Sequence, residues 1–136
     1  MAKLKCFAMK SILVDQSELM YLKSILERMN YICELKVRLY TEENISYHNL
    51  INEKFVHQYC MPDVNVILII FDCYLISKCH YYYRHSLEDI LHSFQENLLL
   101  FDRFWKNIRC CYDAIFSCQH LSTNEIIQGK LFPEIM

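Results

Sequence analysis

Apolar residues follow one another from Val64 to Phe71, interrupted only by Asn65, and Asp72 closes this run. Most of these residues are β-branched or aromatic, and the turn-forming pair Pro62-Asp63 precedes them. A run of this length predicts a strand that is buried on both faces. It is too short to cross a bilayer, which needs about 20 apolar residues. Because such a strand needs helices above and below it, the pattern favours a layered α/β domain.

The segments before this run have clear periods. Residues 11–14 predict a short strand that begins near Met9, and Asp15 and Glu18 have the spacing of a capping box for a helix that ends near Asn30. Strict alternation from Tyr31 to Tyr40 predicts a second strand, whose polar positions place it at the edge of the sheet. After a polar loop, a further helix is expected from the apolar spacing of Leu50, Ile51, Phe55, Val56 and Tyr59.

The second half of the chain is less regular. Residues 73–84 fit no single element, and a helix with Ser86 as its cap is expected over residues 87–94. Residues 97–101 fit a fourth strand or a helical turn, residues 104–115 have helical spacing, and residues 117–121 fit a weak fifth strand. The Ser122/Glu125 pair predicts a last short helix. Together these elements predict a three-layer, flavodoxin-like parallel sheet with helices on both faces, in one domain spanning residues 1–136.

The composition excludes several functional classes. The chain has 136 residues, 54% of them hydrophobic, and a net charge of −2 with scattered lysines and arginines, so no basic surface for nucleic acid is expected. The single glycine rules out a glycine-rich nucleotide loop. The first nine residues lack the long apolar segment of a secretory signal, so we expect a cytoplasmic protein whose eight cysteines are reduced and in part buried.

The cysteines and histidines do not form a recognisable metal motif. Cys73, Cys79 and His80 are close in sequence, but no C-x-x-C pair is present, so no metal and no cofactor are expected. The tyrosines at positions 81–83 are a possible phosphorylation cluster, for which packing is the favoured interpretation.

Several local motifs nevertheless resemble those of a Toll/interleukin-1 receptor (TIR) domain. Cys33 and Arg38 stand where the second strand of a TIR domain carries a cysteine and ends in an arginine, and Ser77 follows the third strand. The motifs Leu39-Tyr40-x-x-Glu43-Asn44-x-Ser46 and Leu87-Glu-x-Ile90-Leu-His-Ser93 are most similar to the divergent TIR-like domains of the B-cell adaptor group. The Arg-Asp and Pro-Gly pairs of receptor TIR domains are absent, which favours the divergent adaptor type.

The resemblance implies a non-enzymatic adaptor in signal transduction and innate immunity that self-associates or pairs with other TIR-like domains. Its contact surface would be the loop after the second strand, which contains Thr41, Glu42, Glu43, Asn44, Ser46, Tyr47 and His48. Enzymatic TIR domains cleave NAD with a glutamate early in the third helix. Tyr82 stands at that position here, and Glu88 lies nearly two turns further on, so no enzymatic activity and no catalytic residue are expected.

Two alternatives remain open. A catalytically inactive, nuclease-like scaffold domain of the XPF type also begins with a strand ending in Val-Asp, as residues 12–15 do. Its Glu-Arg-Lys metal motif is missing, and Asn52-Glu-Lys54 is a poor substitute. The other alternative is an all-helical protein, against which the alternation from Tyr31 to Leu39 argues.

Overall fold

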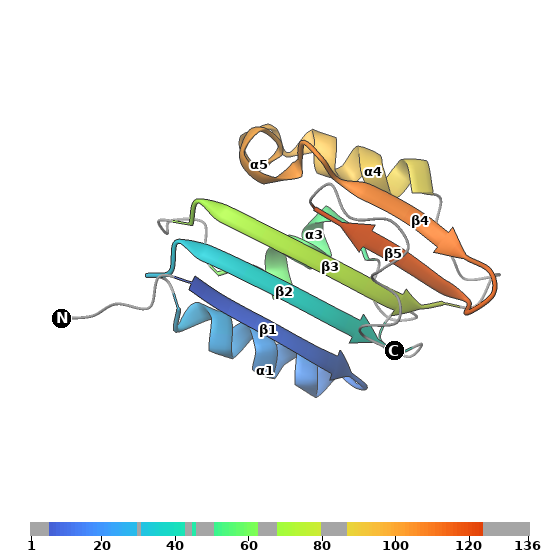
Figure 1. The fold of residues 1–136 in the computed structure, drawn as a ribbon, viewed down its shortest axis with the longest axis horizontal. Helices are drawn as coiled ribbons and strands as arrows, with labels where there is room; N and C mark the ends of the chain where they lie inside the picture. Colours follow the sequence, from blue (N-terminus) through green and yellow to red (C-terminus); the bar gives the residue numbers. More distant parts are fainter. Residues whose placement is uncertain are drawn as a thin grey trace.

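A computed structural model describes residues 6–29, 31–42, 45, 51–62, 68–79 and 87–123. Five strands and several helical segments make up this part of the chain (Figure 1). The strands are β1 (Cys6–Leu13), β2 (Glu34–Thr41), β3 (Ile70–Lys78), β4 (Arg109–Asp113) and β5 (Cys118–Ser122). The helical segments are α1 (Gln16–Glu27), α3 (Glu53–Tyr59), α4 (Leu87–Glu96), the single turn α5 (Leu98–Leu100) and the π-helical turn η2 (Phe101–Trp105).

The five strands form one mixed sheet in the order β1-β2-β3-β5-β4. β1, β2 and β3 are parallel, whereas β5 is antiparallel to both of its neighbours (Figure 1). The α/β class is therefore confirmed, but the prediction of an all-parallel sheet is wrong for β5. The physical reason is the short turn over residues 114–117, since only antiparallel strands can be joined by such a turn.

The described helices pack on one face of the sheet, which differs from the expected helices on both faces. Residues from α1, α3 and α4 share one core with the inward-facing residues of β2 and β3, and Figure 1 shows the helices behind the strands. The strand order explains this arrangement. The chain crosses the sheet in the same direction from β1 to β2 and from β2 to β3, so right-handed crossovers place α1 and α3 on the same face. In the flavodoxin order 2-1-3-4-5 the direction reverses, and helices reach both faces.

Local sequence explains why these elements form. The predicted N-cap of α1 is confirmed, because the Asp15 carboxylate accepts a hydrogen bond from the backbone N–H of Glu18. The apolar stripe of α1 is buried against the sheet, and the stripe of α4 buries Ile90 and Phe94. The aromatic centre of the core is Trp105, whose ring packs edge-on against Phe71 and Phe94 at centroid distances of 5.8 and 5.1 Å.

The opposite face of the sheet carries a smaller buried cluster. Tyr74, Ile76 and Cys118 form it, and the half-buried Tyr40 packs against it. The Tyr74 hydroxyl lies 2.5 Å from Nδ1 of His120, and both side chains are buried. This contact joins β3 to β5, the pair of strands at which the sheet changes from parallel to antiparallel.

The apolar run from Val64 to Phe71 is not the central strand. β3 begins at Ile70, near the end of the run, and continues through Asp72 to Lys78. Ile69 is 70% exposed and Ile70 is 47% exposed, so the second half of the run is not buried on both faces. Residues 63–67 lie outside the described part of the chain. The strand alternates inward residues such as Cys73 and Leu75 with outward ones, and its outward side is also largely buried.

The structure differs from three further predictions about secondary structure. The second strand is confirmed as β2, but it lies between β1 and β3 rather than at the edge. Residues 97–101 belong to α5 and the start of η2 and do not form a strand. The helix expected over residues 104–115 is replaced by β4, whose alternation of exposed and half-buried positions is that of an edge strand. The predicted fifth strand is confirmed as β5, and the helix expected after Ser122 lies outside the described residues.

Candidate functional site

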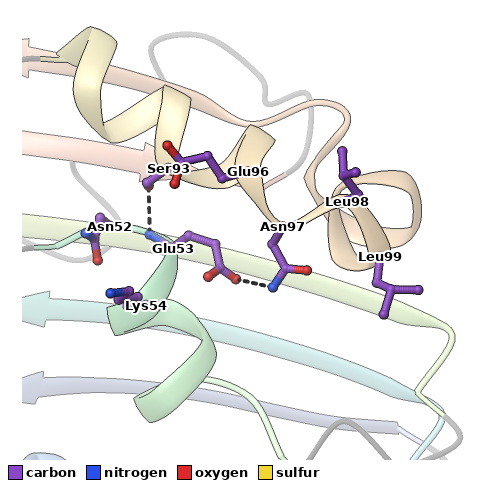
Figure 2. Close-up of a pocket in the computed structure, with 8 residues that line it drawn as sticks. All are labelled: Asn52, Glu53, Lys54, Ser93, Glu96, Asn97, Leu98 and Leu99. Atoms are coloured by element: carbon purple, nitrogen blue, oxygen red, sulfur yellow. Dashed lines mark hydrogen bonds between the residues drawn. The ribbon is translucent and has the colours of Figure 1, made fainter.

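The candidate site is a cavity of about 650 Å³ between the start of α3 and the end of α4 with its following turn α5 (Figure 2). This volume is within the range of ligand-binding clefts. The side chains that line it are polar at one end and apolar at the other. They are Asn52, Glu53, Lys54, Ser93, Glu96, Asn97, Leu98 and Leu99.

Glu53 is the central polar residue of the cavity. Its side chain is buried, with 6% of the residue exposed. Its carboxylate oxygen Oε2 accepts a hydrogen bond from Nδ2 of Asn97 at 3.1 Å and lies 3.8 Å from Nδ1 of His57. A buried carboxylate needs such partners, because an uncompensated charge away from water is costly. Glu53 therefore ties α3 to the end of α4 while its carboxylate stays at the cavity wall (Figure 2).

Hydrogen bonds from Ser93 and two helix caps fix the polar wall of the cavity. The Ser93 hydroxyl accepts a hydrogen bond from the backbone N–H of Glu53 at 3.1 Å and donates one to the carbonyl oxygen of Ile90 at 2.5 Å. Asn52 caps α3 by accepting from the backbone N–H of Phe55. In the same way Asn97 caps α5 by accepting from the N–H of Leu100. The polar end of the cavity is thus built from helix caps, which fix side-chain positions through the backbone.

The apolar end consists of Leu98 and Leu99 on the α5 turn, on the opposite side of the cavity from Asn52 and Lys54 (Figure 2). Leu98 is 78% exposed and Leu99 is 82% exposed, while the next residue, Leu100, is buried in the core. The α5 turn therefore anchors itself through one leucine and presents two others to solvent. Adjacent exposed leucines beside a cavity are typical of a surface that binds another molecule.

The groups that line this cavity are of the kinds that recognise another molecule. A cavity with one buried carboxylate, one ammonium group and two leucines can hold an apolar side chain and orient a nearby amide or cationic group. Asn52 and Asn97 use their side-chain oxygens for capping. Among the described residues no group of three or more His, Cys, Asp or Glu side chains is placed to hold a metal ion. The tripeptide Asn52-Glu-Lys54, which was compared with the metal motif of nuclease-like domains, lines this cavity. The side-chain oxygen of its asparagine caps α3.

Of the seven residues predicted as the contact surface, Thr41 and Glu42 lie in the described part of the chain, and neither of them lines the cavity. Thr41 is the last residue of β2 and is 1% exposed, so it does not contribute an exposed loop side chain. Glu42 is half-buried, and its backbone N–H donates to the carbonyl oxygen of Leu13. Glu43, Asn44, Ser46, Tyr47 and His48 lie outside the described residues. The proposed contact through these five residues therefore stays a prediction.

All eight cysteines lie in the described residues, and no disulfide joins any two of them. The neighbouring Cys60 thiol, together with burial, raises the pKa of Cys73 well above its ordinary value. Burial also raises the pKa of Cys110 to about 12 and that of Cys118 to about 11. A thiol with a raised pKa is a poor nucleophile at neutral pH, which disfavours these three cysteines as nucleophiles.

The cavity was missed by sequence reasoning. Its residues come from positions 52–54 and 93–99, and only their packing brings them together. One signal was present in the sequence, since Leu98-Leu99-Leu100 begins an apolar run directly after the polar end of a helix. Three leucines in one helical turn point in different directions, so they cannot all be buried against a single sheet.

Comparison with protein-family models, with curated proteins and with solved structures finds no match for this chain. In the described residues, no helix has the length and apolar character required to cross a bilayer.

Proposed function

We propose that this chain is a non-enzymatic protein-interaction module whose cavity between α3 and α4 receives a segment of a partner protein. The observation that carries the proposal is the pair of exposed leucines, Leu98 and Leu99, at the rim of a cavity with a buried carboxylate. Large apolar side chains next to each other on a surface are a feature of binding sites. Partner side chains that cover them would gain burial energy that the isolated chain lacks.

The polar end of the cavity indicates which partner segment fits. Glu53 and Glu96 bring carboxylates to it, and Lys54 brings one ammonium group. An apolar side chain with a cationic or amide group next to it would cover the leucines and reach the carboxylates. The segment is therefore expected to be apolar with a flanking basic residue.

This function agrees with the adaptor role that the TIR resemblance implies, including a cytoplasmic location and homotypic or heterotypic pairing. The proposal does not depend on that family. The strand order 1-2-3-5-4 differs from the flavodoxin order that a TIR domain implies, so the proposal of TIR-type pairing rests on the sequence motifs alone.

The experiment that tests the proposal replaces Leu98 with a photoreactive benzophenone residue in cells that express the chain. We expect a defined cross-linked protein whose formation is abolished by Leu99→Asp in the same chain. The matched control places the benzophenone at Tyr21, which is 70% exposed on α1. The same set of adducts from both positions, or adducts from position 98 that survive Leu99→Asp, would refute binding at the cavity.

The absence of enzymatic activity is part of the same proposal. It depends on the tyrosine at position 82, where an NAD-cleaving TIR domain has its glutamate. Incubation of the purified chain with NAD should release no nicotinamide. Release of nicotinamide that Glu88→Gln abolishes would show instead that Glu88, exposed in the first turn of α4, serves as the catalytic carboxylate.

A further inference from the structure

Three polar residues form one row across the sheet, on the face that the helices cover. The ladder registers place Thr41 of β2 beside Ser77 of β3, and Ser77 beside Gln119 of β5. Two positions earlier in β2 and β3, on the same face, Leu39 and Leu75 belong to the hydrophobic core. The row, which we call the polar row, therefore replaces core side chains with hydrogen-bonding groups at the carboxyl end of the parallel strands.

Two hydroxyl groups of the polar row are buried without a hydrogen bond. Thr41 and Ser77 are each 1% exposed. Within the described part of the chain, neither Oγ1 of Thr41 nor Oγ of Ser77 has a hydrogen-bond partner in the protein. Buried polar groups of folded proteins nearly always have a partner, which is either a protein group or an ordered water. Two neighbouring exceptions therefore call for a common explanation.

The spacing of the two hydroxyls suits a bridging molecule. Thr41 and Ser77 are direct partners in the ladder of β2 and β3, and neighbouring strands lie about 4.8 Å apart. The two hydroxyls do not bond to each other. A water oxygen that bonds to both at about 2.8 Å spans a gap of up to about 5.5 Å. One water molecule is therefore the right size to join them.

Gln119 supplies further hydrogen-bonding capacity beside the two hydroxyls. It is 5% exposed and pairs directly with Ser77 across the sheet. Its amide has an acceptor oxygen and two N–H donors, so it can bond to a water while it keeps another partner. A buried water typically makes about three hydrogen bonds to polar groups that would otherwise be unsatisfied. The polar row provides this number, and because none of its side chains is charged, it favours a neutral molecule over an ion.

We infer that the polar row binds one ordered water molecule, held by the hydroxyls of Thr41 and Ser77 and by the amide of Gln119. This water links β2, β3 and β5 through their side chains, in addition to the backbone ladder. Thr41 is also the first of the seven residues predicted as a contact surface, so the water fixes the position at which that segment begins. The inference is independent of the cavity between α3 and α4.

The first test counts long-lived waters by magnetic relaxation dispersion of the water oxygen nucleus. The double variant Thr41→Val/Ser77→Ala removes both hydroxyls and should show one long-lived water fewer than the wild type. Thr41→Ser keeps the hydroxyl and should show the wild-type number. Thr123→Val is the matched control, because Thr123 is also 1% exposed but its hydroxyl bonds directly to the backbone of β3. It should leave the number unchanged. A wild-type number of waters in the double variant would overturn the inference.

Urea denaturation of the single variants gives an independent test. With the water bound, Thr41→Val and Ser77→Ala should each lower the folding equilibrium constant about 5-fold, because each removes one hydrogen bond. The double variant should lose less than the product of the two effects, because both hydroxyls and the water leave together. If no water binds, each hydroxyl is buried and unsatisfied, so its removal should raise the constant. A raised or unchanged constant in both single variants would overturn the inference, even if the double variant does not fold.

Discussion

At the scale of single residues, burial separates residues that the sequence presents as equivalent. Leu39 and Ile69 are both aliphatic residues in apolar segments, yet Leu39 is fully buried and Ile69 is 70% exposed. The difference arises from where each residue lies relative to the strands. Leu39 faces the helices from β2, whereas Ile69 lies just before β3 begins. The effect of a substitution therefore depends on the position of the residue in the sheet more than on local hydrophobicity.

Leu39→Ala should lower the free energy of unfolding by about 2 to 5 kcal/mol, the usual cost of truncating a fully buried leucine. Ile69→Ala serves as its control and should change this free energy by less than about 0.5 kcal/mol, because its side chain is mostly exposed. Urea denaturation of both variants provides the measurement. Equal losses would mean that the run before β3 is buried after all.

We expect His120 to make the free energy of unfolding depend on pH. Burial lowers the pKa of His120, with an opposing contribution from Asp113. The unfolded chain, with an ordinary histidine pKa of about 6.5, therefore takes up the proton first as the pH falls. The contribution to stability is complete above about pH 6.5 and is lost as the pH falls toward the lower pKa of the folded state. His120→Gln should show a shallower decline between about pH 7 and pH 5 in urea denaturation, and an unchanged decline would exclude this histidine as its source.

At the scale of elements, the β4–β5 hairpin depends on an unusual backbone conformation. Among the described residues, Ser117 is the non-glycine residue with a positive φ, at 53°. A residue with a side chain in this left-handed region is destabilised by about 1 to 2 kcal/mol. Glycine would remove this strain, but its more flexible unfolded chain would offset part of the gain in stability. The hairpin therefore contains a position at which glycine is the better residue.

Ser117→Gly should raise the free energy of unfolding by about 0.5 to 1 kcal/mol, the balance of these two effects. Ala114→Gly, in the same turn, is the matched control and should not stabilise the chain. Thermal unfolding of both variants would test this. If Ser117→Gly lowers the melting temperature, contacts of the serine side chain outweigh the relief of the backbone.

At the scale of the whole molecule, the fold distributes the eight cysteines between surface and interior. Cys6 is exposed on the edge strand β1, whereas Cys60, Cys73, Cys79 and Cys118 are buried. Reactivity requires an accessible thiolate, so exposure and pKa both limit modification.

Iodoacetamide at about pH 8 should therefore modify Cys6 within the folded chain and leave the four buried thiols intact until denaturant is added. Mass spectrometry of peptides after partial labelling gives the order of modification. Labelling of Cys73 or Cys118 in the folded chain at a rate similar to that of Cys6 would show that the sheet opens readily.

The sequence by itself determined the elements whose signal is local. The Asp15 cap and the apolar stripe of α1 lie within one helix, and the alternation of β2 lies within one strand, so their patterns contain the needed information. The weak strand near residues 117–121 was also predicted correctly as β5. The α/β class follows from these elements, because strands and helices that alternate must pack in layers.

Only the tertiary structure decided the features that depend on pairing. Whether residues 109–113 form a helix or an edge strand was settled by the partner strand β5, since an exposed edge strand and an amphipathic helix both leave half of their residues polar. The start of β3 was settled by its register with β2, which continues across Asp72. The cavity of Glu53, Asn97 and the α5 leucines arose from the packing of helices on one face. The strand order sets the distances between segments that are far apart in the chain. Local periodicity contains no information about that order.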